Sequence, residues 1–227
     1  MSAPTVSYPF SHLPTVASDF ARPSASEIDA ASKIQPATLH EAAGKMGALP
    51  SQIKPVHAHF KVCGPAFTVH GPGIDNLWLH RALVLAQPGD VLVAHVSGAF
   101  EAGYWGEVMS TMAKQRGLAG FVIDGCVRDG ALLADIGLPV FSRGLCLKGT
   151  GKDFGAIGWI NAPVLIGDVT IHAGDLISGD GDGLVVIPRE KIAATIEASR
   201  LRETQEIDIL NRLRAGEATL DVYGWNR

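Results

Sequence analysis

Arg128 and Asp129 are the side chains with the clearest chemical potential, because they follow an apolar run and precede a helical pattern. In parallel α/β proteins, loops of this kind hold ligands. An arginine can bind a carboxylate or an enolate through two parallel hydrogen bonds, and an aspartate can hold a hard divalent cation such as Mg²⁺. The alternative interpretation is an ion pair at the start of a helix, and spacing alone supports both equally.

Glu107 stands at a second junction of the same kind, after the apolar run 91–96 and before another helical pattern. Neighbouring parallel strands end at the same edge of a sheet, so Glu107 should lie near Asp129. Gly106 allows close approach of the backbone, and amides in the first turn of a helix have no partner within the helix. A metal and oxyanion site is therefore predicted. Its members would be Arg128, Asp129, Glu107 and the backbone amides of Val108 and Met109.

Two glycine-rich segments look like ligand-binding loops but lack residues that such loops need. With Gly183 at position six of a calcium loop, Ser178 and Arg189 take positions one and twelve, where acids are required. The segment 148–152 has neither the first glycine of a phosphate-binding loop nor the Ser or Thr that follows its lysine. A Schiff-base route is disfavoured because no lysine is firmly placed in the site, although the two lysines of this segment stay open.

The elements around these loops follow the alternating pattern of an α/β protein. Strand and helix patterns alternate from residue 61 to residue 142, which predicts a parallel layer with right-handed crossovers. After Gly144, short strand patterns between Gly-Asp turns predict antiparallel strands in a second layer. A long charged helix is expected over 188–216. The expected strands are 61–69, 91–96, 120–124, 139–142, 163–167, 169–172 and 184–187. Besides the long helix, helices are expected over 76–86, 105–116 and 128–136.

The first 26 residues differ from the rest, being rich in Ser, Pro, Ala and Thr. Residues 1–26 are expected to form an extended arm, either laid on a neighbouring subunit or partly disordered, and residues 27–227 a single domain. A short helix should open near Ser26, and a second one should begin with Thr38 as its cap.

Composition excludes several classes of protein. Of the 227 residues, 47% are apolar and 19% charged, which provides for a core and excludes general disorder. The net charge of −4, without a basic stripe, argues against nucleic acid as a partner. No apolar run is long enough to span a membrane, and no secretory signal is visible. Cys63, Cys126 and Cys146 lie far apart, as expected of reduced thiols in a cytoplasmic protein.

The order of an acid, twenty residues and Arg-Asp, found here as Glu107 followed by Arg128 and Asp129, resembles a family signature. The family is that of the 4-hydroxy-4-methyl-2-oxoglutarate / 4-carboxy-4-hydroxy-2-oxoadipate aldolases, in the superfamily of the regulator of ribonuclease E activity. The likeness covers about residues 36–223. Its further blocks are Gly64-Pro65-Ala66-Phe67-Thr68-Val69, Asp75-Asn76-Leu77 and the segments 87–93, 139–141, 174–175 and 183–188.

The resemblance implies roles for individual residues. Asp129 would bind the divalent metal directly, and Glu107 would hold metal-bound water, although the family usually has Asp at that position. Arg128 would bind the pyruvyl part of the substrate, together with the backbone amides of Val108 and Met109. An acid on the C-terminal helix would enter the site of a neighbouring subunit and hold the metal through water. Glu206 is the better match for that acid and Glu203 the weaker one; without the family, both belong to a solvated helix face.

The function implied by the resemblance is divalent-metal-dependent retro-aldol cleavage of a 4-hydroxy-2-oxo acid or diacid to pyruvate and a second oxo acid. Oxaloacetate decarboxylation is expected as a side activity, Mg²⁺ or Mn²⁺ or another divalent ion as the metal, and the catabolism of aromatic compounds as the setting. The implied fold is α/β: an α/β/β/α sandwich similar to a swivelling phosphohistidine-type domain, with a long C-terminal helix. The implied assembly is a homotrimer or homohexamer.

Two alternatives stay open at this point. One is a dedicated oxaloacetate decarboxylase on the same scaffold, because loss of CO₂ from oxaloacetate gives the same pyruvate enolate. The other is a non-enzymatic, ribonuclease-binding regulator of the same fold. Such a regulator is not expected to keep acids at the positions of Glu203 and Glu206.

Overall fold

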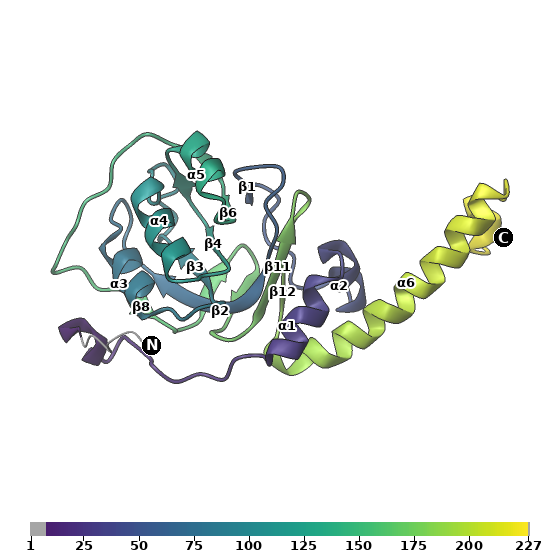
Figure 1. Cartoon of the computed structure of the whole chain (residues 1–227), viewed down its shortest axis with the longest axis horizontal. Helices are drawn as coiled ribbons and strands as arrows, with labels where there is room; N and C mark the ends of the chain where they lie inside the picture. Colours follow the sequence, from purple (N-terminus) through teal and green to yellow (C-terminus); the bar gives the residue numbers. More distant parts are fainter. Residues whose placement is uncertain (1–7, 227) are drawn as a thin grey trace.

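A mixed eight-stranded sheet lies at the centre of the computed structural model, which describes residues 8–226 (Figure 1). The strand order is β1-β6-β4-β3-β2-β11-β12, and β8 also pairs with β2. The strands β2, β3, β4 and β6 run parallel, whereas β1, β8, β11 and β12 pair antiparallel with their neighbours. Their bounds are β1 (Lys54–Pro55), β2 (Val62–His70), β3 (Val91–His95), β4 (Gly120–Ile123), β6 (Val140–Ser142), β8 (Trp159–Ile160), β11 (Leu176–Asp180) and β12 (Gly183–Ile187).

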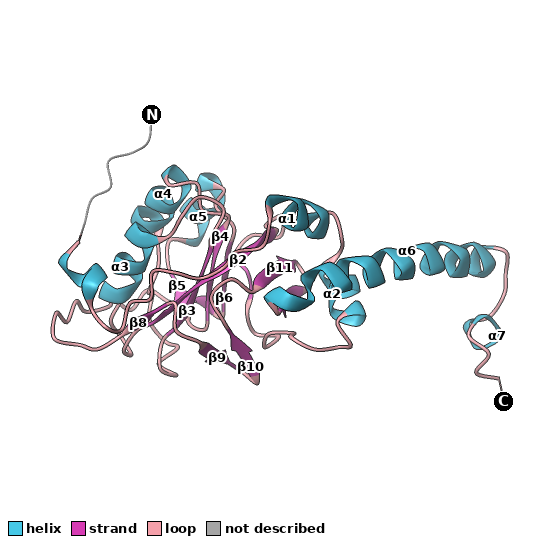
Figure 2. Ribbon diagram, turned by 90° about the horizontal axis from the view of Figure 1, so that it is seen from below, coloured by secondary structure: helices cyan, strands magenta, loops and turns pink. Residues whose placement is uncertain are grey.

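The predicted strand–helix alternation is present in the parallel part. Figure 2 shows α3 (Leu77–Leu85), α4 (Glu107–Gln115) and α5 (Gly130–Ile136) on one side of the sheet. The hairpin of β9 (Val164–Ile166) and β10 (Val169–Ile171) lies on the other side, against β2 and β3. A further short parallel pair joins β5 (Cys126–Val127) to β7 (Gly144–Leu145).

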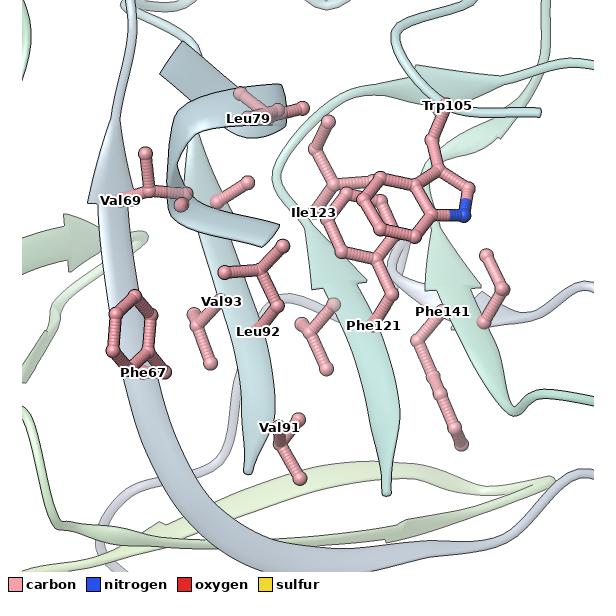
Figure 3. Close-up of a cluster of buried hydrophobic side chains, with 14 of the residues drawn as sticks. Phe67, Val69, Leu79, Val91, Leu92, Val93, Trp105, Phe121, Ile123 and Phe141 are labelled. Carbon is pink, nitrogen blue, oxygen red and sulfur yellow. The ribbon is translucent and has the colours of Figure 1, made fainter. Parts of the chain in front are cut away.

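The main core lies between this sheet and its helices. Residues of β3 and β4 are buried on both faces, which explains why these strands are continuous apolar runs in the sequence. Trp105 stacks on Phe121, with ring centroids 3.9 Å apart and an interplanar angle of 14° (Figure 3). This contact fixes the segment before α4 against β4, and thus places the start of α4 beside the end of that strand.

A second, smaller core joins the N-terminal helices to the C-terminal one. The helices α1 (Ala25–Ser32) and α2 (Pro36–Ala42) pack with β12 and with the first turns of α6 (Ile192–Arg214). Beyond that contact, α6 projects from the body of the molecule and leads to the short α7 (Thr219–Val222) (Figure 1). The remaining helical turns are η1 (Pro9–His12) and η2 (Arg189–Lys191).

The expected second layer of antiparallel strands is only partly present. Within residues 8–226, β9 and β10 form the single separate antiparallel pair, because β11 and β12 extend the main sheet next to β2. The segment 178–180, interpreted from sequence as turn, is the end of β11, and the turn itself lies between Asp180 and Gly183. Pairing of Gly179 with β2 and β12, and of Asp180 with β12, overrides the low strand propensity of Gly and Asp in this segment.

The second helix begins earlier than predicted. Thr38 lies inside α2, whose N-cap is Gln35 and whose first position is Pro36. Proline suits that position because its fixed φ matches the helix and its missing N–H would have no partner there. The first helix is capped by Ser24, whose side chain and that of Glu27 form a capping box.

The described part of the N-terminal arm packs against its own chain. Ala17 N donates to Ile160 O at 3.1 Å, and Ile160 N donates to Thr15 O at 2.9 Å, so the arm lies along β8. Arg22 forms two hydrogen bonds of 2.8 and 2.9 Å with the buried carboxylate of Asp90. Residues 1–7 lie outside the described residues.

Two expectations drawn from composition can be compared with the described residues, 8–226. Within that range no helix combines the length and the apolar character needed to cross a bilayer. Cys63, Cys126 and Cys146 are all free thiols.

Candidate active site

Glu107 and Asp129 meet at the edge of the sheet where β3 and β4 end. The backbone N–H of Glu107 donates to Oδ2 of Asp129 at 3.1 Å, and Nε of Arg128 lies 3.6 Å from the same oxygen. Both charged side chains reach solvent, since that of Arg128 is 50% exposed and that of Asp129 is 34% exposed. Val108 and Met109 follow in the first turn of α4, where backbone amides have no acceptor within the helix. The structure therefore brings together the five sequence-predicted residues that come from this edge.

The backbone around this contact leaves little freedom. A Cβ atom at position 106 would clash with Oδ2 of Asp129, so only glycine allows this approach. Arg128 N donates to Trp105 O at 2.9 Å, which ties the two loops together. Asp129 has a left-handed backbone conformation with φ of 61°, which is uncommon for a residue other than glycine. Such strained positions are frequent at functional sites.

The helix after these residues begins later than predicted. It starts at Gly130 rather than at Arg128, and Asp129 is its N-cap. The Asp129 carboxylate makes no capping hydrogen bond to its own helix, and turns instead to the N-terminus of α4. This orientation disfavours the interpretation of Arg128 and Asp129 as a simple helix cap.

A pocket of about 260 Å³ lies over this contact. Besides the predicted residues it is lined by side chains from α3 and from the segment between β7 and β8. Asn76 is buried, and its Nδ2 donates to Tyr104 O at 2.7 Å, whereas its Oδ1 has no hydrogen-bond partner. The lining residues are Asn76, His80, Gly103, Tyr104, Gly106, Glu107, Val108, Met109, Arg128, Asp129, Gly149, Thr150 and Lys152.

Three polar lining residues, Asn76, His80 and Lys152, could take part in chemistry but were not assigned to the site from sequence. The helical pattern 76–86 predicts that His80 is a core residue, with support of a neighbouring site as the alternative; Lys152 stays open, and Asn76 belongs to a family block only. A signal for Asn76 existed, because it follows the end of β2 as Glu107 follows β3 and Asp129 follows β4. Applying the strand-end rule to a third parallel strand would have found it.

His80 faces a mixed electrostatic environment. Burial lowers its pKa below the ordinary value of 6.5, and the nearby Lys152 ammonium lowers it further, whereas Asp75 acts in the opposite direction. The imidazole is therefore mostly neutral near pH 7. A neutral imidazole can accept a proton, which the ammonium of Lys152 cannot do.

Glu203 and Glu206 do not line the pocket of their own chain. Both lie on α6, where Glu206 is exposed and Glu203 is half-buried. Glu206 is 3.7 Å from Arg202 in an ion pair along the helix. A role for either glutamate at this pocket would need a second copy of the chain.

The donor set of the pocket suits a hard cation that keeps part of its water. Glu107 and Asp129 offer carboxylate oxygens, and Oδ1 of Asn76 is a buried acceptor without a partner. No group of three His, Cys, Asp or Glu side chains that could hold a metal is found within residues 8–226. Mg²⁺ is typically bound through one or two carboxylates together with water and substrate oxygens, so the residues present fit it.

Comparison with known proteins assigns this chain to a family. The family model described as RraA-like, Aldolase/RraA, matches residues 25–186. The chain belongs to the RraA-like family. The family resemblance seen in the sequence is thereby confirmed.

Relatives of this RraA-like chain include both named and structurally characterised proteins. A protein of Halalkalibacterium halodurans, named "Putative 4-hydroxy-4-methyl-2-oxoglutarate aldolase", is 37% identical over 158 residues, which are 70% of this chain and 74% of that protein. The crystal structure of an uncharacterized protein from Pseudomonas syringae pv. tomato matches with a TM-score of 0.79 at 27% identity, covering 90% of this chain and 96% of the other. RraAS2 of Streptomyces coelicolor, described as an unusual member of the RNase ES inhibitor RraA protein family, matches with a TM-score of 0.73 at 26% identity, covering 86% of this chain and 99% of the other.

Proposed function

We propose that the protein is a divalent-metal-dependent lyase that cleaves a 4-hydroxy-2-oxo acid or diacid to pyruvate and a second oxo acid. The observation that carries the proposal is the contact between Glu107 N and Asp129 Oδ2, because it gathers two carboxylates, a guanidinium and the amides of a helix start in one pocket. The name of the relative from H. halodurans supports the same reaction class. Oxaloacetate decarboxylation is proposed as a side activity.

Arg128 binds the charged end of the substrate. Its guanidinium lies at the pocket wall and is half exposed, so it can pair with the 1-carboxylate and 2-oxo oxygen of the pyruvyl part. The amides of Val108 and Met109 lie beside it and donate to the same oxygens. When the C3–C4 bond breaks, its electron pair moves towards the 2-oxo oxygen, and these donors stabilise the enolate that forms.

The proton of the C4 hydroxyl needs an acceptor within the pocket. The neutral imidazole of His80 and the carboxylate of Glu107 are the two side chains that can take it directly or through water. Oδ1 of Asn76, which lacks a partner, can accept a hydrogen bond from the substrate. Lys152 provides a positive charge for a second carboxylate of a diacid substrate.

The residues proposed to hold the metal are Asp129 directly and Glu107 through water. Glu206 of a neighbouring subunit, or Glu203 less well, would contribute a further acid through water in a trimer or hexamer. A bound Mg²⁺ or Mn²⁺ supplies Lewis-acid stabilisation of the negative charge on the enolate oxygen.

The test is an assay of the purified protein on two substrates. Pyruvate release is measured from 4-hydroxy-4-methyl-2-oxoglutarate and from oxaloacetate, with Mg²⁺ and after treatment with EDTA. Metal-dependent release from the hydroxy acid, lost in the Arg128→Ala variant, supports the proposal. Release from oxaloacetate alone points to a dedicated decarboxylase, and activity that EDTA leaves unchanged contradicts the proposed metal.

The likeness to RraAS2 favours a second candidate, a non-enzymatic regulator that binds a ribonuclease. This function would need no substrate in the pocket and no metal. The matching test is inhibition of a ribonuclease E-type enzyme by the purified protein. Inhibition that survives in Asp129→Ala, together with the absence of pyruvate release by the wild type, would favour the regulator.

A further inference from the structure

Asp75 is a buried carboxylate that joins two walls of the candidate pocket without lining it. It is 5% exposed and stands two residues before α3. Its Oδ1 accepts a hydrogen bond from Leu77 N at 2.8 Å, in the first turn of α3. Its Oδ2 accepts one from Asp153 N at 2.5 Å, in the segment between β7 and β8. One side chain therefore connects elements that lie 78 residues apart in sequence.

The backbone repeats this connection on either side of Asp75. Gly151 N donates to Ile74 O at 2.8 Å, and Asn76 N donates to Gly151 O at 3.3 Å. Asp75 and Gly151 form an isolated parallel bridge. Residues 151–153 thus run beside residues 74–76, outside any longer strand.

The sequence neighbours of the two bonded residues are pocket residues. Asn76 follows Asp75, and Lys152 precedes Asp153, and both line the pocket. His80 lies one turn further along α3 on the same side. If Asp75 and Asp153 move apart, their sequence neighbours Asn76 and Lys152 therefore move apart as well.

A carboxylate suits this position better than a neutral side chain. Two backbone N–H groups point at it, and each oxygen takes one of them. An asparagine of the same shape has one oxygen only, so its NH₂ group would face one of the two N–H donors. The buried negative charge is stabilised by both bonds, and loss of one leaves a buried donor without a partner.

We propose that Asp75 is a positioning residue, which holds the Lys152 segment against the start of α3 and thereby sets the width of the pocket between Lys152 and Asn76. The assignment of a substrate to this pocket rests on the proposed function, whereas the connection made by Asp75 does not. The role of Asp75 is exerted through Lys152, whose ammonium needs a fixed place to bind a carboxylate.

The experiment compares Asp75→Asn with a matched control, Asp175→Asn. Asp175 is also 5% exposed and also accepts two backbone N–H groups, from His172 at 2.8 Å and from Arg189 at 3.1 Å, but it does not line or adjoin the pocket. Both variants should lose thermal stability. Only Asp75→Asn should raise KM for 4-hydroxy-4-methyl-2-oxoglutarate, by about tenfold, which corresponds to the loss of one buried hydrogen bond. The change in kcat should be smaller. Equal KM values for the two variants would overturn the proposal.

A double-mutant cycle tests whether Asp75 acts through Lys152. Lys152→Met keeps the length of the side chain and removes its charge. If Asp75 serves to place that charge, the double variant should have the KM of Lys152→Met alone. Additive effects on KM would show that Asp75 acts elsewhere, and would overturn the proposed role.

Amide hydrogen exchange tests the connection made by Asp75 without an activity assay. In Asp75→Asn, the amide of Leu77 or of Asp153, whichever faces the new NH₂ group, should exchange about tenfold faster than in the wild type, and neither amide should change in Asp175→Asn. Should Asp75→Asn not fold, Asp75→Ser keeps one acceptor for Leu77 and cannot reach Asp153, and the same two readouts apply. Faster exchange in a protein without lyase activity would contradict the proposed function alone, and unchanged exchange would contradict the role of Asp75 alone.

Discussion

The backbone N–H of Glu107 donates a hydrogen bond of 3.1 Å to Oδ2 of Asp129, so a helix that follows β3 is fixed to a loop that follows β4. The two residues are 22 positions apart in sequence, yet one carboxylate links them. Because β3 and β4 are parallel neighbours, their ends meet at the same edge. The contact depends on a glycine before Glu107 and on a strained backbone at Asp129.

Asp129→Ala should abolish pyruvate release and weaken binding of Mn²⁺. The carboxylate is the proposed direct metal ligand, and its removal also frees the Glu107 amide. Pyruvate formation and titration calorimetry with Mn²⁺ measure the two effects. Asp135→Asn changes an exposed carboxylate on the same helix and is the control. Wild-type rates in Asp129→Ala would refute its assignment to the site.

Gly106→Ala should lower kcat strongly while leaving the protein folded. The added methyl group meets Oδ2 of Asp129, so the carboxylate must turn away or α4 must move. A displaced charge donor or metal ligand costs roughly 10²–10³ in kcat. Steady-state kinetics and circular dichroism measure both properties. Gly181→Ala places a methyl group in open space and should match the wild type; a fully active Gly106→Ala would contradict the close packing described here.

The site at the carboxyl ends of the parallel strands could be predicted from sequence, because the residues that mark it follow directly on recognisable strand patterns. Buried parallel strands are continuous apolar runs, and the polar residues that follow them stand out, as Glu107 and Asp129 do. Asn76 follows a strand in the same way, but the buried Oδ1 that marks it is visible only in three dimensions. The role of Asp75 depends on contacts with residues 151–153, and no local pattern encodes such a long-range pairing.

The error at β11 also comes from long-range contacts. β11 contains Gly179 and Asp180, which favour turns, but pairing with β2 and β12 makes the segment a strand. Glu203 and Glu206 could be placed on a helix from the sequence. The pocket proposed for them belongs to a neighbouring copy of the chain, and no local sequence pattern encodes a contact between copies. The likeness to a swivelling phosphohistidine-type domain stays a prediction.

Glu206→Gln should reduce pyruvate release if the pocket is shared between subunits. Glu206 does not line the pocket of its own chain, so its effect must arise in a neighbouring copy. Mixing Glu206→Gln chains with Asp129→Ala chains, after dissociation and reassembly, should restore part of the activity. Some mixed sites then combine an intact Asp129 with an intact Glu206. Glu197→Gln, an exposed change on the same helix, is the control, and mixtures that stay inactive would contradict a shared site.

The stability of the fold should fall between pH 7.5 and pH 5 because of a histidine pair away from the pocket. Nδ1 of His70 and Nδ1 of His95 are 2.8 Å apart at the ends of β2 and β3, and the ring of His70 also packs on Trp159. One Nδ1 must donate and the other must accept. When both imidazoles are protonated, neither Nδ1 can accept, and the hydrogen bond is lost.

The sign of this pH dependence follows from the direction of the pKa shifts. Burial lowers the pKa of both imidazoles below the ordinary 6.5; the neighbouring His95 lowers that of His70 further, and Asp124 partly offsets the shift of His95. The unfolded chain therefore binds protons first as the pH falls, and the free energy of unfolding decreases from about pH 6.5 towards the lower values of the folded state. Urea unfolding at both pH values measures the loss. His70→Gln should reduce the difference, and His59→Gln, an exposed change, should leave it as in the wild type. An equal pH dependence in His70→Gln and the wild type would show that the pair does not contribute.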